Sequence, residues 1–306
     1  RALGHEVSYS EINRFAQYEP NQEGLEVAQI KAVLDGFGIK CADYDYEESP
    51  ELRESPRHYQ KCVYAGIESG MGSLLVFGVT SEEARENEGH IIPFYGHTFN
   101  KDTWTPEAEI AYFRVGENTR YIPSDNWTSS FLGHDDNFGP NFCFPRLYFS
   151  DENVAYVAEL LKPGYAYGGV DAEAQSLRFL YSVLDYLEGA EHEPANHWLS
   201  RLLFTARAAR YQRIVLRAIA VERKTYVDHI SSEQDWDYNP ESVQVITTLR
   251  TELPDHLWVV EMSVPQLFPA NKSKLGDIVL DGGIDLPDNL EEDCSHFIFV
   301  RLPGEY

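Results

Sequence analysis

Up to residue 70, hydrophobic positions recur at the three- and four-residue spacing of helices. Ser8 precedes an acidic residue at the spacing of a helix cap, and Gly36 and Gly38 end a second periodic stretch. From residue 73 onward the apolar positions form short runs, as in buried strands. The sequence therefore predicts a helix starting at Ser8, helices over 21–38 and 56–70, an acidic surface loop over 41–57, strands over 73–79, 90–96, 110–115 and 131–134, and a connector over 120–127.

Helices followed by strands indicate an α+β fold rather than the alternating pattern of a parallel sheet. The pattern changes near residue 150, which predicts two domains, 1–150 and 151–306. We expect the first domain to be helices followed by an antiparallel sheet, and the second to be a mixed helix and β-rich accessory domain. For the second domain the pattern predicts helices over 153–161, 174–187 and 196–209, and strands over 214–221, 243–249, 257–264, 277–281 and 296–301.

The charge of the chain limits the classes of molecule that we expect it to bind. There are 50 acidic and 25 basic residues, a net charge of -25. Such a surface repels phosphate backbones, so we expect no nucleic-acid partner. No apolar run approaches the ~20 residues of a membrane span, so we expect no membrane partner either. Four cysteines lie far apart without a Cys-x-x-Cys pair, which favours reduced thiols in a cytoplasmic protein over a zinc ribbon or a disulfide framework.

His90 is the first candidate for chemistry. It heads an apolar stretch bracketed by Gly89 and Gly96, and glycines leave room for close approach. A second predicted strand ends in Asp135 and Asp136. A carboxylate from a neighbouring strand can fix the tautomer of a histidine and stabilise its imidazolium, as in sites with a Cys or Ser nucleophile.

The choice between the two acids stays open. Strand alternation places Asp135 on one face with Phe131 and Gly133, and Asp136 on the other, so simple register favours Asp135 slightly. Asp125 is a weaker third candidate. The Asp-Asp-Asn-Phe-Gly run is also turn chemistry, in which acids often only cap backbone amides.

A metal centre is a less favoured interpretation of the same region. Its potential ligands are imidazoles and carboxylates that cluster in the sequence but lack the His-x-x-x-His or Cys-pair spacing of familiar zinc sites. No nucleotide-binding glycine motif and no Gly-x-Ser-x-Gly elbow occurs either. We therefore expect no metal and no cofactor. The residues concerned are His90, His97, His134, Asp135 and Asp136.

A matching nucleophile is harder to find. Cys62 falls within a predicted helix, whereas reactive thiols prefer a helix N-terminus, so a buried structural role is favoured. Cys41 lies among acidic residues that raise a thiol pKa. Cys143 and Cys294 follow the histidine in the chain.

The order of short motifs resembles the papain-like cysteine peptidases, in particular the bacterial C39-like group. The motifs are Gly-x-x-Val-Ser from residue 4, Gln-Ile-x-x-Val-Leu from residue 29, Gly-Ile-x-x-Gly-x-x-x-Leu-Leu-Val from residue 66, His-Ile-Ile-Pro-Phe-Tyr-Gly-His from residue 90, and the strand ending in Asp. The resemblance covers residues 1–149 and does not extend to the second half.

By this resemblance His90 is the catalytic base, Gly96 is the glycine after the His strand, and Asp135 is the orienting acid. Asp136 stands where the family usually has Pro, so either acid remains possible. The family's Gln and nucleophilic Cys would lie upstream of Arg1, on a helix ending near Leu3. The implied function is a bacterial cysteine peptidase-like hydrolase acting on a peptide or protein, with the second domain selecting substrate or partner.

The alternative hypothesis is a non-catalytic protein-binding module on a peptidase-like scaffold. Exposed aromatic residues would form its interface. Tyr165 and Tyr167, in a Gly-rich loop, are candidates for such exposed aromatics, although plain core packing is favoured for most of the aromatic residues.

Overall fold

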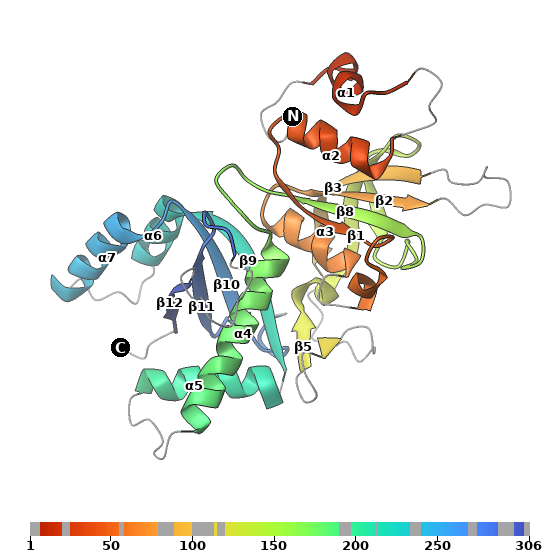
Figure 1. The fold of residues 1–306 in the computed structure, drawn as a ribbon. Coiled ribbons are helices and arrows are strands. Elements are labelled where there is room, and N and C mark those ends of the chain that lie inside the picture. Colours follow the sequence, from red (N-terminus) through yellow and green to blue (C-terminus); the bar gives the residue numbers. More distant parts are fainter. Residues whose placement is uncertain are drawn as a thin grey trace. The chain divides into compact units, whose positions relative to one another are not determined.

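The chain folds into two compact units, shown in Figure 1 in a computed structural model. The first unit comprises residues 1–100 and 128–163, and the second comprises residues 101–127 and 164–306. The structure describes residues 7–19, 25–54, 58–78, 89–99, 113–114, 120–189, 197–211, 213–232, 240–268, 274–286 and 297–302. Within these ranges it contains seven α-helices and two six-stranded sheets, which confirms the predicted mixture of α and β structure.

The first unit is built around an antiparallel sheet with the strand order β1-β8-β2-β3-β6-β7. Its strands are β1 (Cys41–Asp45), β2 (Ser73–Gly78), β3 (Gly89–Phe99), β6 (Thr128–Asp135), β7 (Gly139–Pro145) and β8 (Val154–Leu160). Its helices are α1 (Tyr9–Ala16), α2 (Val27–Gly36) and α3 (Tyr59–Glu68), with a short 3-10 helix η1 (Pro50–Glu54).

Alternation along β2 and β8 gives the sheet two packed faces. On one face, Ile30 and Leu34 of α2 pack with Val76 and Tyr156. The opposite face carries the other register, which includes the buried Leu75 and its partners on β8 and β3, and it faces α3 (Figure 1). The sheet is thus covered by α2 on one side and α3 on the other, with both faces buried as in a central sheet layer.

The second unit is built around a sheet with the order β12-β11-β10-β9-β5-β4. All its pairs are antiparallel except β5 with β9, which is parallel. The strands are β4 (Phe113–Arg114), β5 (Arg120–Pro123), β9 (Ile214–Glu222), β10 (His256–Ser263), β11 (Gly276–Asp281) and β12 (Phe297–Arg301). The helices are α4 (Gly169–Glu188), α5 (His197–Tyr211), α6 (Arg223–Ser232), α7 (Pro240–Glu252) and the 3-10 helix η3 (Ser124–Trp127).

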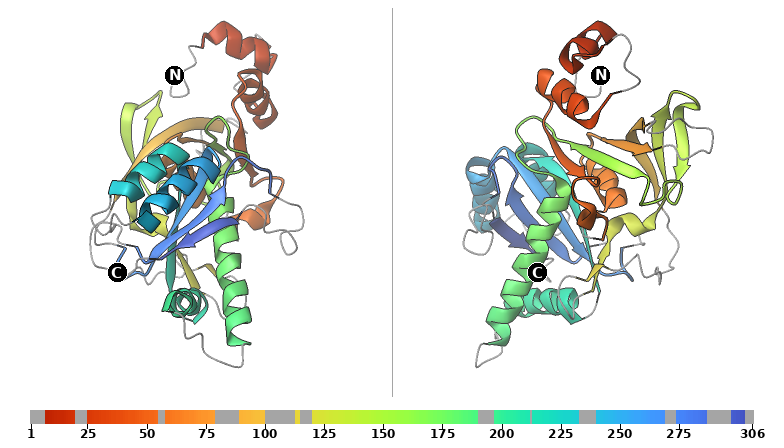
Figure 2. Two further views of the ribbon diagram at one scale, coloured as in Figure 1. Left: turned by 90° about the vertical axis from the view of Figure 1, so that its left-hand side faces the viewer. Right: turned by 45° about the vertical axis from the view of Figure 1, so that its right-hand side comes forward.

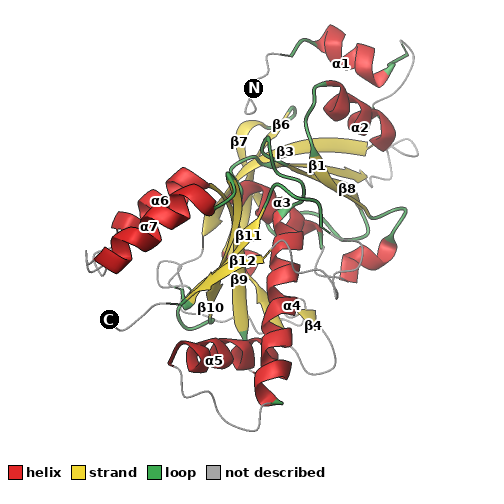
Figure 3. Cartoon of the chain, turned by 60° about the vertical axis from the view of Figure 1, so that its left-hand side comes forward, coloured by secondary structure: helices red, strands yellow, loops and turns green. Residues whose placement is uncertain are grey.

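Helices cover this second sheet as well (Figure 3). Apolar side chains of α6 and α7 pack on Leu257, Val259 and Val279 of the sheet. The two helices lie side by side in Figure 2. Trp258, on the alternate register, points to the opposite face, and its indole N–H donates to the carbonyl of Tyr167. Alternation along β10 therefore separates two apolar layers.

Tyr165 and Tyr167 are part of this packing, so the expectation that they form an exposed interface is wrong. They are 2% and 6% exposed. The Tyr165 ring meets Trp258 edge-on, with centroids 5.3 Å apart. Each hydroxyl donates to a backbone carbonyl of the sheet, Tyr165 to Leu257 of β10 and Tyr167 to Asp281 of β11. Their glycine-rich loop therefore packs against β10 and is not an exposed surface loop.

Three predicted segments have a different structure. The helix expected over 153–161 is strand β8, because pairing with both β1 and β2 outweighs the local helix propensity of its Ala and Leu residues. The strand expected over 243–249 lies within α7, where the spacing of the buried Ile246 and Leu253 is helical. The loop expected over 41–57 contains β1 and η1, and the connector over 120–127 contains β5 and η3.

The boundary between the units also differs from the single division expected at residue 150. Strand β8 completes the first sheet, so that unit continues to residue 163. Residues 101–127 belong to the second unit, where β4 and β5 extend its sheet beside β9. The predicted boundary rested on a single change in hydrophobic pattern. It could not show that residues 101–127, which lie between β3 and β6 of the first unit in the sequence, belong to the second unit.

Candidate functional site

Adjacent strands of the first unit bring an imidazole and two carboxylates together. His90 lies near the start of β3, opposite Phe77 of β2. Asp135 is the last residue of β6, which pairs with β3. Because β3 and β6 are antiparallel, the start of one lies beside the end of the other. The side chains of His90 and Asp135 therefore meet at one end of the sheet.

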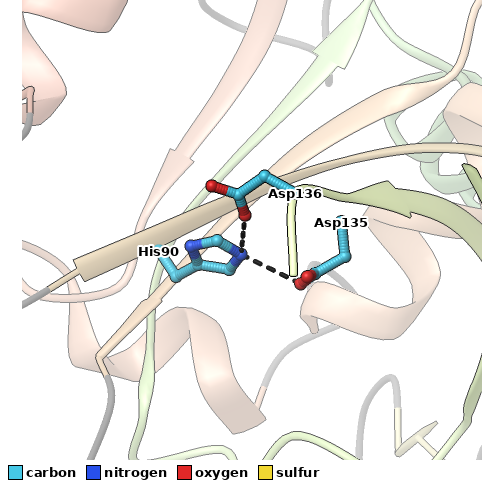
Figure 4. Close-up of side chains that lie close together, drawn as sticks. All are labelled: His90, Asp135 and Asp136. Atoms are coloured by element: carbon cyan, nitrogen blue, oxygen red, sulfur yellow. Dashed lines mark hydrogen bonds and ion pairs between the residues drawn. The ribbon is translucent and has the colours of Figure 1, made fainter. Parts of the chain in front are cut away.

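The imidazole contacts both acids through one nitrogen (Figure 4). Nε2 of His90 lies 2.9 Å from Oδ2 of Asp135 and 3.2 Å from Oδ1 of Asp136. The side chain of Asp135 is 4% exposed, that of His90 is 22% exposed and that of Asp136 is 78% exposed. The histidine thus rests between a buried carboxylate and one in contact with solvent.

The second oxygen of Asp135 is held by the backbone of the following turn. Oδ1 accepts the N–H groups of Asn137, at 2.7 Å, and of Phe138, at 3.1 Å. Burial raises the pKa of Asp135, but the N–H of Asn137, the His90 imidazole and the N–H of Phe138 stabilise the carboxylate and bring the pKa below its ordinary value. Asp135 therefore both caps the turn and orients the imidazole.

The alternation predicted for β6 is consistent with these positions. A Cβ on Gly133 would lie 2.9 Å from Ile92 and 3.1 Å from Phe94, so Gly133 shares its face with the alternate residues of β3 that include His90. Register alone would have kept Asp136 away from the histidine. Asp136 reaches it because β6 ends at Asp135 after a register shift, and the residue after a strand end is free of the alternation.

Phe77 is a site neighbour that the sequence pattern did not identify. Its ring lies edge-on to the His90 imidazole, with centroids 5.6 Å apart and planes at 87°. It also contacts Phe149, at 4.7 Å between centroids. This aromatic contact covers part of the imidazole, while the acids hold its Nε2 edge. The only signal in the sequence was the place of Phe77 at the end of an apolar run.

The other predicted site residues lie elsewhere. His97 points to Glu68, with Nε2 2.6 Å from Oε1, and its Nδ1 lies 3.5 Å from the Thr128 hydroxyl. His134 is exposed on β6 and, as the residue directly before Asp135, it lies on the opposite face of the strand. Asp125 is a buried residue of η3 in the second unit. Of the five residues considered for a metal, the structure gathers His90, Asp135 and Asp136.

The cysteines in the described part of the chain differ in environment. Cys62 is fully buried in the first turn of α3, rather than in mid-helix, and accepts the Tyr46 hydroxyl at 3.6 Å. Burial, followed by the charge of Asp43, raises the pKa of Cys41 to about 11. Cys143 is exposed on β7. Cys294 lies outside the described residues.

The hydrogen-bond geometry selects a tautomer for His90. An ionised carboxylate can only accept, so Nε2 carries the proton that faces Asp135. A neutral imidazole has one N–H, and its lone pair is then on Nδ1. The arrangement can therefore take up a proton at Nδ1 while Asp135 stabilises the resulting imidazolium.

Comparison with known proteins adds no relative. Neither family models, nor curated proteins, nor solved structures give a match to the chain. Among the helices that the structure describes, none has the length and apolar character that crossing a bilayer requires. The function is therefore argued from the geometry of the site.

Proposed function

We propose that the first unit is the base-bearing part of a papain-like cysteine hydrolase that acts on peptides or proteins. In this proposal His90 is the general base and Asp135 orients it. Asp136 is a weaker, solvent-exposed contact of the same ring. The nucleophilic thiol comes from sequence preceding Arg1, and the second unit contributes to the selection of substrate or partner.

One observation carries the proposal, the 2.9 Å contact between His90 Nε2 and Asp135 Oδ2. Asp135 is buried, and the turn amides fix its other oxygen, so the acid cannot swing away without breaking two hydrogen bonds. An orienting acid has to be held in this way to keep the imidazole in one tautomer. A contact formed only for stability would not require an imidazole that is partly open to solvent, as the 22% exposed His90 is.

The proposed reaction follows from the tautomer. Nδ1 of His90 removes the proton of the thiol, and the thiolate attacks the carbonyl carbon of the scissile amide. The resulting imidazolium gives that proton to the leaving amine as the C–N bond breaks, which leaves a thioester. Water, deprotonated by the same nitrogen, then hydrolyses the thioester and restores the thiol. Asp135 remains ionised throughout and stabilises the imidazolium.

The decisive experiment uses the full-length protein and a thiol-reactive peptide probe. We expect His90→Ala to reduce the rate of labelling at least a hundredfold, because the thiol loses its base. His134→Ala is the matched control, since that imidazole is exposed on β6, outside the contact network of His90. Equal labelling rates in the two variants and the parent would exclude the assignment and favour a non-catalytic binding module on the same scaffold.

A further inference from the structure

Three metal-ligating groups converge at the His90 site from two adjacent strands. One atom from each of His90, Asp135 and Asp136 lies within 4.8 Å of the other two. The acids reach the same imidazole nitrogen, Nε2, from separate sides (Figure 4). Orienting a catalytic histidine requires one carboxylate, so the second carboxylate calls for an explanation of its own.

The site has fewer hydrogen-bond donors than acceptors at the imidazole nitrogen Nε2. Nε2 carries at most one hydrogen, which can point well at one oxygen. Asp135 Oδ2, at 2.9 Å, and Asp136 Oδ1, at 3.2 Å, compete for that hydrogen. A divalent cation in its place would accept electron pairs from all three atoms, and it would offset the two negative charges, whereas a neutral imidazole offsets none.

The distances suit a small transition-metal ion. Zinc binds imidazole nitrogen and carboxylate oxygen at ~2.0–2.2 Å, so neighbouring ligands in a tetrahedron stand roughly 3.3–3.5 Å apart. The two N–O separations, 2.9 and 3.2 Å, are shorter, so both carboxylate oxygens would have to move away from Nε2 by a few tenths of an ångström to admit the ion. The exposed Asp136 can shift by itself, whereas at Asp135, whose Oδ1 is held by the turn, the His90 ring would have to move away from Oδ2.

We propose that His90, Asp135 and Asp136 form a binding site for a divalent transition-metal ion of the zinc class. Three protein ligands leave a coordination position for water or another donor. The net charge of -25 raises the local concentration of cations around the chain. An imidazole ligand favours zinc-like ions over magnesium or calcium, which prefer sites made of oxygen atoms alone.

Metal binding would inhibit the hydrolase, a consequence that rests on the function proposed above. The ion takes the lone pair of Nε2, so the single proton of the neutral ring moves to Nδ1. Nδ1 then has no lone pair with which to accept the thiol proton. Without a metal ion, His90 would act as a base oriented by Asp135. With a metal ion bound, the same three residues would be its ligands and His90 would no longer act as a base.

The test measures zinc binding directly, by competition with a chromophoric zinc indicator, in a Cys143→Ser background. That substitution removes an exposed thiol that would itself bind zinc. We expect one zinc ion per chain, with affinity reduced at least tenfold in Asp136→Asn. Since the Asp136 side chain is 78% exposed, this variant should fold like the parent. His90→Ala provides a second variant with the same expected loss.

Asp151→Asn is the matched control. Asp151 forms a pair with His58, at 3.0 Å, but no second carboxylate joins that pair among the described contacts. We expect its zinc affinity to equal that of the parent. Absence of stoichiometric binding, or equal affinities in the Asp136→Asn variant and the parent, would overturn the proposal.

The measurement separates this proposal from the proposed hydrolase. Zinc binding requires no nucleophile and no substrate, so it can be measured even in a protein that has no hydrolase activity. Binding that depends on Asp136, together with labelling that is independent of His90, would support the metal site and reject the hydrolase. Labelling that depends on His90, without zinc binding, would reject only the metal site.

Discussion

His97 and Glu68 form a second imidazole–carboxylate pair in the first unit, with Nε2 2.6 Å from Oε1. It differs from the His90 pair in burial, since the two side chains are 8% and 6% exposed. The Tyr64 ring lies 4.9 Å from the imidazole centroid. The pair joins the end of α3 to β3, so we assign it a structural role, and the His90 side chain, at 22% exposed, is the more accessible of the two imidazoles.

Glu68→Ala should therefore destabilise the first unit without a specific effect on the proposed site. Removing one partner of a buried hydrogen bond costs about 1–3 kcal/mol, because the other partner is left buried and unsatisfied. Hydrogen exchange of the α3 and β3 amides under native conditions would measure the loss. Asp151→Ala is the control: its side chain is 54% exposed, and exposed ion pairs contribute about 1 kcal/mol or less. Equal losses in the two variants would contradict the structural assignment.

Asp135 and Asp136 should differ sharply in their effect on thiol labelling. An amide at 135 can still accept from the turn N–H groups, but its NH₂ would face Nε2 and favour the tautomer with the proton on Nδ1. We expect Asp135→Asn to lower the labelling rate ~10²–10⁴-fold, the range for loss of an orienting acid.

Asp136→Asn should lower the same rate less than about threefold, because exposed charges interact weakly with their neighbours. Labelling rates of the folded variants in the full-length protein measure both effects. The reverse order, with the larger loss in Asp136→Asn, would make Asp136 the orienting residue. That outcome would leave His90 as the base.

Much of the site could be predicted from sequence because its signals are local. The Asp-Asp-Asn-Phe-Gly run identified a turn, and strand alternation favoured Asp135 over Asp136. An apolar run that begins with an imidazole and another that ends in carboxylates sufficed to suggest neighbouring strands. The contact of Asp136 with the same ring could not be predicted, because it depends on where β6 stops being regular.

The errors in the predicted secondary structure have identifiable physical causes. In β8, pairing with residues of β1 and β2 that lie 77 to 119 positions earlier in the chain overrides the helical preference of a short segment. In α7, a run of β-branched residues suggested a strand, although Pro240 at the first helical position favours a helix. Pairs such as His97 with Glu68 leave no sequence signal, because only the packing of α3 on the sheet brings them together.

Gly133→Ala should destabilise the strand that carries Asp135. The added methyl group would lie 2.9 Å from Ile92 and 3.1 Å from Phe94, which are both buried residues of β3. Overpacking of this kind typically costs about 1–3 kcal/mol. Gly78→Ala is the matched control, since its nearest atom is the Asn153 carbonyl oxygen at 3.9 Å. Hydrogen exchange in β6 should show reduced protection in Gly133→Ala alone, and equal protection in both variants would contradict the close packing.

The last prediction concerns Asp277 of β11, which is 1% exposed. Burial raises its pKa above the ordinary value, although the charges of Lys274 and Arg301 oppose the shift. Lys274 Nζ lies 2.9 Å from Oδ1. A carboxyl with a raised pKa contributes its full stability below about pH 3.8, the unfolded value, and loses it as the pH rises through the folded pKa. Asp277 thus weakens the second unit near neutral pH relative to a neutral group.

The Asp277→Asn variant does not titrate at this position, so its stability relative to the parent should increase as the pH rises above about 3.8, and each unit of pKa shift corresponds to about 1.4 kcal/mol. Hydrogen exchange of the β10 and β11 amides at several pH values measures this difference. Asp151→Asn should show the opposite trend in the first unit, and only below about pH 3.8, because the hydrogen bond to His58 lowers the pKa of Asp151 and outweighs its burial. A stability difference for Asp277→Asn that is independent of pH would show that Lys274 and Arg301 fully offset the cost of burying this charge.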